Sequence, residues 1–170
     1  CTLINPDVSL DELLAAAKPN TKVLFAETLG NPALSVLDFE KWSAAAKKLG
    51  VPLVVDNTLA TPALCRPLEH GANIVIHSTT NYSDGHATSV GGMVIDGGNF
   101  DWKASGKFKG LTEPNESYHG LIYTEKFGAA AFAAKLRSHL LRDFGCTMAP
   151  MNAYLTHLGL DTLHLRMERH

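Results

Sequence analysis

IVIHSTTNYSDGHATSVGGMVI, residues 74–95, places a long polar segment between two short apolar runs. The polar segment, residues 77–92, holds several hydroxyls, two imidazoles and three glycines. Compact domains usually join two strands through a handful of residues, and longer joins tend to carry function. We therefore treat this segment as a candidate site, with an ordinary polar turn as the alternative interpretation.

The composition is that of an ordinary globular chain, with 170 residues of which 45% are hydrophobic and 19% charged. This length suits one domain that buries a sizeable core. The formal net charge is -2 and the sequence has no basic cluster, so nothing in it indicates a surface that binds nucleic acid or an anionic membrane. No apolar run approaches the length that spans a bilayer, and the start does not resemble a signal peptide.

The cysteines are odd in number and scattered, at Cys1, Cys65 and Cys146. This pattern favours reduced thiols in a cytoplasmic protein over a zinc site or a disulfide framework. The sequence starts at Cys1 without a methionine and reaches His170 inside a helix-like pattern. We therefore expect the chain to be a piece of a longer protein.

Apolar runs of strand type alternate with helical patterns along the first half of the chain. The runs are residues 23–26, 53–55 and 74–76, and helix signals include a capping box at residues 9–12 and an N-cap at Asp38. Such alternation is typical of βαβ units. We expect an α/β fold with a mainly parallel sheet flanked by helices. Further along, the pattern predicts three more helices, over residues 126–141, 152–158 and 161–170.

Polar residues follow each predicted strand directly, at residues 27–31, 56–58 and 78–84. In open α/β sheets, ligands bind beyond the carboxyl ends of the strands. The sequence therefore predicts a site at that edge of the sheet. A doubly wound nucleotide-binding domain shares this architecture, but the chain has neither G-x-G-x-x-G after a strand nor a P-loop motif.

Each candidate side chain has an ordinary structural explanation beside the functional one. Asp56 could cap or form a turn, or it could keep a ring nitrogen protonated. Ser78 and Thr80 could satisfy turn backbone, or they could bind phosphate together with turn amides. His77 and His86 are nine residues apart and have no acidic partner at ligand spacing, which weighs against a metal site.

Several blocks, taken together, resemble the Cys/Met-metabolism family of PLP-dependent enzymes, which has fold type I. The match in order and spacing extends over roughly residues 20 to 100. Later blocks resemble O-acetylhomoserine sulfhydrylases within that family, so the resemblance covers nearly the whole chain. The blocks are ETLGNP at 27–32, DNT at 56–58, HSTTNY at 77–82, the glycines and His86 within 85–92, SYHGL at 117–121, FGCTMAP at 144–150 and GLDTLHLRMERH at 159–170.

The resemblance implies pyridoxal 5′-phosphate (PLP) as cofactor and a role for each matching residue. Asp56 matches the partner of the pyridinium nitrogen, Asn31 the hydrogen-bond donor to the phenolic oxygen, and Ser78 and Thr80 the phosphate-binding hydroxyls. Asn81 departs from the family, which has its Schiff-base lysine at this position. An amide nitrogen is neither nucleophilic nor basic, so we expect the chain as written to be inactive. Natural loss, engineered loss and an artefact of writing a lysine–cofactor adduct remain open.

The implied function is a PLP-dependent transfer, the sulfhydrylation of O-acetyl-L-homoserine by sulfide or another thiol to give homocysteine in methionine biosynthesis. The resemblance further implies a cytoplasmic homo-oligomer, a homotetramer, when the protein is full length. A cystathionine γ-synthase or γ-lyase type of enzyme and a non-catalytic PLP-binding variant are the alternatives. We predict that residues 1–145 form a partial PLP-binding large-domain core and that residues 146–170 begin the connection towards a carboxyl-terminal domain.

Overall fold

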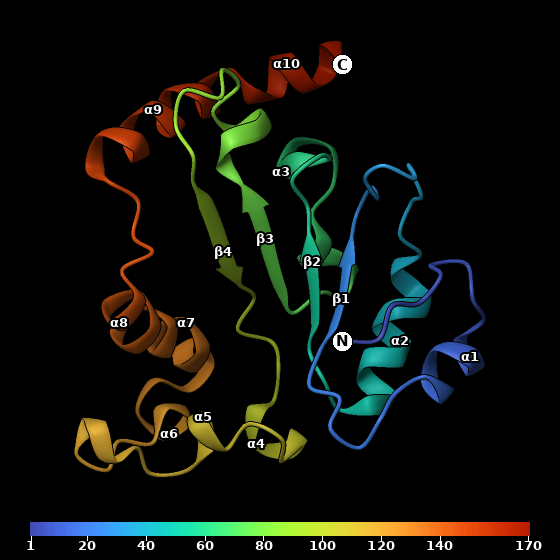
Figure 1. Ribbon diagram of the computed structural model, residues 1–170, viewed down its shortest axis with the longest axis vertical. Helices are drawn as coiled ribbons and strands as arrows, with labels where there is room; N and C mark the ends of the chain where they lie inside the picture. Colours follow the sequence, from blue (N-terminus) through green and yellow to red (C-terminus); the bar gives the residue numbers. More distant parts are fainter.

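The computed structural model describes all 170 residues, and a four-stranded sheet forms its centre (Figure 1). Strands β1 (Leu24–Glu27), β2 (Leu53–Asp56) and β3 (Ile74–Ser78) are parallel, and β4 (Gly92–Asp96) pairs antiparallel with β3. The strands lie side by side in sequence order. The expected α/β fold with a mainly parallel sheet is confirmed, and the second apolar run of residues 74–95 supplies the antiparallel edge strand.

Helices pack on both faces of the sheet, as the alternation of side chains along its strands requires. Leu53 and Val55 of β2 belong to the core on the face covered by α1 (Leu10–Ala15) and α2 (Phe39–Leu49) (Figure 1). Val54 lies against the core of the opposite face. The first core consists of Leu13, Leu24, Leu37, Trp42, Ala45, Ala46, Val51, Leu53, Val55, Ala72 and Val75, and the second of Ile74, Trp102, Leu111, Tyr123 and Ala131.

Local capping explains where the first two helices begin. The hydroxyl of Ser9 accepts from Glu12 N at 3.3 Å, and Ser9 N donates to the Glu12 carboxylate at 2.8 Å. The Ser9 hydroxyl also donates to that carboxylate at 2.8 Å. The two bonds that the carboxylate accepts, first from the Ser9 backbone N–H and then from the Ser9 hydroxyl, lower the pKa of Glu12. Asp38 accepts from the backbone N–H of Lys41 and so caps α2, which ends at Gly50 in the left-handed conformation. Both predicted caps are confirmed.

The remaining elements are mostly short. The single helix expected over residues 126–141 is wrong, because Gly128 (φ 53°, ψ -123°) ends α6 and an α-helix resumes only at residue 131, after a 3₁₀ turn. An alanine-rich pattern does not reveal such a break. The elements are α3 (Thr61–Leu64), α4 (Trp102–Ser105), α5 (Lys109–Thr112), α6 (Tyr123–Phe127), α7 (Ala131–Lys135), α8 (Arg142–Phe144), α9 (Pro150–Asp161) and α10 (Leu163–Arg169), with 3₁₀ turns at Pro67–His70, Glu116–Tyr118 and Gly128–Ala130 and π-helical turns at Thr79–Ser83 and Leu136–Leu141.

Helices α9 and α10 lie across the carboxyl ends of the strands, at the top of Figure 1. Gly145, in the left-handed conformation, ends α8 before the chain crosses to this edge. Helix α9 contacts the π-helical turn Thr79–Ser83, and α10 contacts α3, with Leu163 and Met167 buried. The two last helices that the sequence predicts therefore cover the edge of the sheet that carries the polar strand ends. None of the helices combines the length and hydrophobicity needed to cross a membrane.

Candidate functional site

The polar strand ends meet at one edge of the sheet, which we call the rim. The rim is formed by the ends of β1, β2 and β3 and the residues that follow them directly. Glu27 pairs with Asp56 and Asp56 with Ile76 across the two parallel pairs. Parallel neighbours end on the same side, so the sheet itself brings Asp56 and Ser78 together.

Thr58 connects the ends of β2 and β3. Its backbone N–H donates to Asp56 Oδ1 at 2.9 Å, and its hydroxyl donates to the same oxygen. The hydroxyl oxygen also accepts from Ser78 N at 2.8 Å. Asp56 therefore forms a turn, one of the two roles that the sequence left open for it. Its second oxygen, Oδ2, accepts no hydrogen bond from the protein. The carboxylate is oriented and still has an acceptor to offer.

Ser78, Thr80 and Asn81 form a second group at the rim. The Ser78 hydroxyl donates to Asn81 Oδ1 at 2.7 Å. Thr80 Oγ1 accepts from Gly91 N at 3.1 Å. The Thr80 hydroxyl also donates to Gly91 O at 3.5 Å, which is the upper limit for a hydrogen bond. Asn81 is exposed, and its ψ of -122° kinks the π-helical turn. The structure thus joins Asp56, Ser78 and Asn81 through hydrogen bonds and fixes Thr80 beside them.

Asn31 stands apart from the other predicted residues. Its backbone N–H donates to Glu27 Oε2 at 2.8 Å, in the turn beyond β1. The residue is exposed, and its side chain makes no hydrogen bond with the protein. The structure therefore places Asn31 beyond the end of the neighbouring strand without a bond to Asp56 or Ser78.

Asn57 supports the rim from below and was not singled out by the sequence. It is fully buried, its Oδ1 accepts from the Thr28 hydroxyl at 2.8 Å, and its Nδ2 donates to Cys65 O at 2.9 Å. These bonds connect the ends of β1 and β2 with the loop that follows β2. The signal in the sequence is the polar pair Asp56-Asn57 directly after an apolar strand, of which only Asp56 belongs to the predicted site.

Asp84 organises the loop that follows Asn81. Its carboxylate is buried and accepts from Thr88 N at 2.6 Å, Ser89 N at 3.2 Å and the Thr88 hydroxyl. Burial alone would raise the pKa of Asp84, but the hydrogen bonds from Thr88 and Ser89, together with nearby His86, lower the pKa below its ordinary value. The charged form of Asp84 thus holds residues 84–89 together.

His77 is the buried imidazole of the rim. The residue is only 7% exposed, and its Nδ1 has no hydrogen-bond partner. Burial lowers the pKa of His77, while the Asp56 charge and the Asn57 backbone act in the opposite direction, so the neutral form is favoured. The structure has no group of three or more His, Cys, Asp or Glu side chains that could hold a metal ion.

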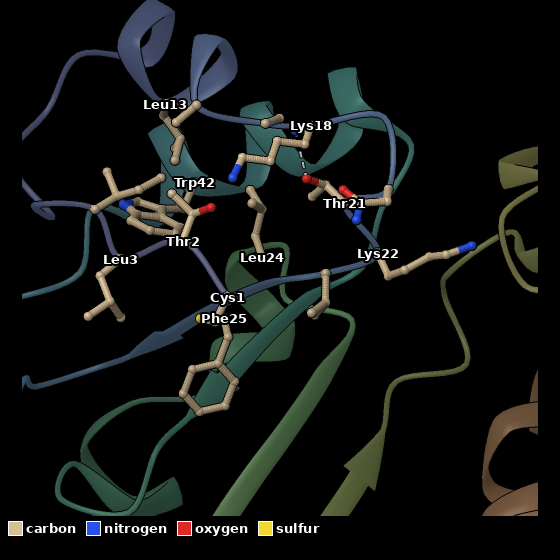
Figure 2. Close-up of a pocket in the computed structure, with 15 residues that line it drawn as sticks. Cys1, Thr2, Leu3, Leu13, Lys18, Thr21, Lys22, Leu24, Phe25 and Trp42 are labelled. Carbon is tan, nitrogen blue, oxygen red and sulfur yellow. Dashed lines mark hydrogen bonds between the residues drawn. The ribbon is translucent and has the colours of Figure 1, made fainter.

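A cavity of about 510 Å³ lies away from the rim, between the amino-terminal residues, α1 and β1 (Figure 2). Most of its lining is hydrophobic, and Lys18 and Lys22 bring the only side-chain charges to it. None of the five residues predicted to form the site lines it. We therefore assign the candidate site to the rim, where carboxylate, amide and hydroxyl groups converge, and not to this cavity. The residues labelled in Figure 2 are Cys1, Thr2, Leu3, Leu13, Lys18, Thr21, Lys22, Leu24, Phe25 and Trp42.

Comparison with protein families gives a match to the model described as Cys/Met metabolism PLP-dependent enzyme, over residues 2–170. The chain is 50% identical over 163 residues to the O-acetyl-L-homoserine sulfhydrylase of Leptospira meyeri, and this match covers 91% of the chain and 37% of the relative. The homocysteine synthase of Schizosaccharomyces pombe is 46% identical over 162 residues, covering 94% of the chain and 38% of the relative. The chain thus spans less than half the length of these curated relatives.

Two solved structures share the fold. A Campylobacter jejuni protein described as an O-acetylhomoserine (thiol)-lyase, which contains N′-pyridoxyl-lysine-5′-monophosphate, superposes with a TM-score of 0.86 at 36% identity. That match covers 95% of this chain and 40% of the other. The O-acetylhomoserine sulfhydrylase of Wolinella succinogenes, a protein of methionine biosynthesis, gives a TM-score of 0.76 at 36% identity, covering 92% and 42% of the two chains.

Proposed function

Because the chain belongs to the Cys/Met metabolism PLP-dependent enzyme family, we propose that its rim is the PLP site of an O-acetylhomoserine sulfhydrylase type of protein. One observation carries the proposal. Thr58 orients the Asp56 carboxylate and holds the Ser78 backbone beside it, while Asp56 Oδ2 has no partner within the protein. An oriented carboxylate with a free oxygen, next to hydroxyl donors, suits a ring that carries both a basic nitrogen and a phosphate.

Each rim residue has a role in this proposal that its chemistry can perform. Asp56 would hold a proton at the ring nitrogen, because its negative charge favours the protonated form. Ser78 and Thr80 would donate hydroxyl protons to the phosphate, and Asn31 would donate its free amide to the phenolic oxygen. When bound, PLP supplies the electron sink that makes bonds at the carbons of an amino acid labile.

The chain does not offer the covalent attachment that PLP enzymes use. Asn81 occupies the position of the family's lysine, and none of the ten lysines of the chain lies between residues 49 and 102. The Asn81 amide already accepts from the Ser78 hydroxyl and cannot act as a nucleophile or a base. We therefore propose that the chain as written holds PLP only by reversible contacts and is inactive. The same observation favours the second candidate function, a non-catalytic PLP-binding protein.

With a lysine at position 81, the proposed reaction is the sulfhydrylation of O-acetyl-L-homoserine, in which sulfide replaces the acetoxy group to give homocysteine and acetate. This reaction would serve methionine biosynthesis. The substrates would be this amino-acid ester and sulfide or another thiol, and the full-length protein would be a homo-oligomer. The names of the relatives support this choice within the family. A cystathionine γ-synthase or γ-lyase type of reaction would use the same rim, so the rim alone does not favour sulfhydrylation over it.

The test is homocysteine formation by the full-length protein carrying Asn81→Lys, supplied with PLP, O-acetyl-L-homoserine and sulfide. Asn81→Gln is the matched control, because it lengthens the side chain but keeps an amide. We expect homocysteine from the lysine variant and none from the control or the Asn81 protein. Formation of cystathionine from the acetyl ester and cysteine would support the γ-synthase alternative, and turnover of cystathionine would support the γ-lyase alternative. If the lysine variant bound PLP but turned over none of these substrates, the result would support the non-catalytic PLP-binding function.

A further inference from the structure

The segment Thr79–Ser89, which we call the rim loop, carries Thr80 and Asn81. Its backbone is tied together by Asp84 N, which donates to Thr79 O, and by Gly85 N, which donates to Asn81 O, each at 2.9 Å. The buried Asp84 carboxylate closes the second half of the loop. Internal bonds thus make the rim loop one unit, so a contact at Ser83–Gly85 also affects the turn in which Thr80 lies.

Helix α9 contacts this unit from outside, through Gly159. A Cβ atom at residue 159 would lie 2.3 Å from Asp84 O and 2.4 Å from Ser83 O, much closer than real Cβ atoms approach backbone. The helix therefore reaches the loop backbone only because residue 159 has no side chain. A glycine inside a helix lowers helix propensity, so its presence in α9 calls for a packing reason of this kind.

Arg166 of α10 completes the contact. Its Nη2 donates to Gly159 O at 2.7 Å and its Nε donates to the Thr162 hydroxyl at 3.1 Å. Its guanidinium also covers Gly85, since a Cβ atom there would lie 2.9 Å from Arg166 Cζ. Bonds from a charged donor are roughly twice as strong as neutral ones. Arg166 therefore fixes α10 to α9 and both helices to the rim loop.

We propose that α9 and α10 form a clamp that sets the position of the rim loop, with Gly159 and Arg166 as positioning residues for the phosphate-binding hydroxyl of Thr80. The part that concerns Thr80 rests on the proposed function, whereas the clamp itself does not. Neither Gly159 nor Arg166 needs to touch the ligand. A loop held in place before binding loses less conformational freedom when the phosphate arrives, which raises affinity.

Amide hydrogen exchange tests the clamp without any ligand. Gly159→Ala should speed exchange at the Asp84 and Gly85 amides by about tenfold or more, because the added methyl group pushes α9 away from the loop. Gly110→Ala is the matched control: it also adds a methyl group in a helix, but this meets only the flexible end of Lys135. Arg166→Ala changes no residue of α9, but it removes the bonds from the guanidinium to Gly159 O and to the Thr162 hydroxyl, and it should therefore also speed exchange at these two amides. Unchanged exchange in both clamp variants would overturn the clamp.

Ligand binding tests the positioning role. Pyridoxine 5′-phosphate and pyridoxine lack the aldehyde, so neither reacts with lysines. Arg166→Ala should weaken binding of the phosphorylated compound by about tenfold and leave the affinity for pyridoxine nearly unchanged, with Arg166→Lys recovering part of the loss. Equal loss for both compounds, or no loss, would overturn the positioning role. If the unaltered protein bound neither compound, the proposed function would fail, while the exchange result would still decide the clamp.

Discussion

Replacing Thr58 with valine removes one hydroxyl group and leaves a side chain of nearly the same shape. The hydroxyl donates to the Asp56 carboxylate, a charge-assisted bond worth about 1.5–3 kcal/mol, and accepts from Ser78 N, a neutral bond worth about 0.5–1.5 kcal/mol. Thr58 is only partly buried, so water replaces part of what is lost. We expect Thr58→Val to lower the free energy of unfolding by about 2–3 kcal/mol.

Urea unfolding followed by circular dichroism measures this difference, provided that the slope of the transition stays the same. Thr58→Ser is the matched control, because it keeps the hydroxyl and removes only a methyl group. It should therefore retain most of the stability that valine loses. The reasoning would be refuted if Thr58→Val unfolded within about 0.5 kcal/mol of the unaltered protein, or if serine cost as much as valine.

Three further predictions address the core, the first cap and the rim loop. Leu53→Ala should cost about 2–5 kcal/mol in urea unfolding because Leu53 is fully buried, whereas Leu64→Ala, at an exposed position, should stay within about 0.5 kcal/mol of the unaltered protein. Ser9→Ala should cost about 1 kcal/mol, since it removes the capping box of α1, and an unchanged transition would argue against the cap. The lowered pKa of Asp84 means that its ionised form stabilises the fold above the ordinary value of 3.8. This stabilisation should be lost as the pH falls from there through the folded-state pKa, so acid unfolding of Asp84→Asn should show a weaker pH dependence, and an equal dependence would contradict the assignment.

Elements specified by nearby residues could be predicted from the sequence. The capping box at Ser9 and the cap at Asp38 depend on atoms within three residues, and both occur as expected. The three parallel strands follow from short apolar runs between helical patterns, and the convergence of Asp56 and Ser78 follows from parallel pairing. The order of the polar strand ends along the sequence is therefore sufficient to predict the rim.

Features that depend on contacts between distant segments could not be predicted in this way. Two bonds at the rim join residues that lie far apart in the sequence, from Ser78 N to the Thr58 hydroxyl and from Gly91 N to the Thr80 hydroxyl. No rule of sequence spacing predicts such bonds. The approach of α9 to the rim loop depends on Gly159, where the only signal was a glycine within a helical pattern. The break at Gly128 could not be predicted because alanines follow this residue in the sequence and only the structure reveals its positive φ.

The central claim, that PLP binds at the rim with residue 81 beside it, is tested most directly by the site of covalent labelling. The Asn81→Lys variant would be incubated with PLP, reduced with borohydride, digested and mapped by mass spectrometry, with the Asn81 protein treated in parallel. We predict a phosphopyridoxyl group on residue 81 of the variant, suppressed by excess pyridoxine 5′-phosphate, and no preferred position in the Asn81 protein. Equal, scattered labelling of the other lysines in both proteins, with residue 81 unmodified, would contradict the account.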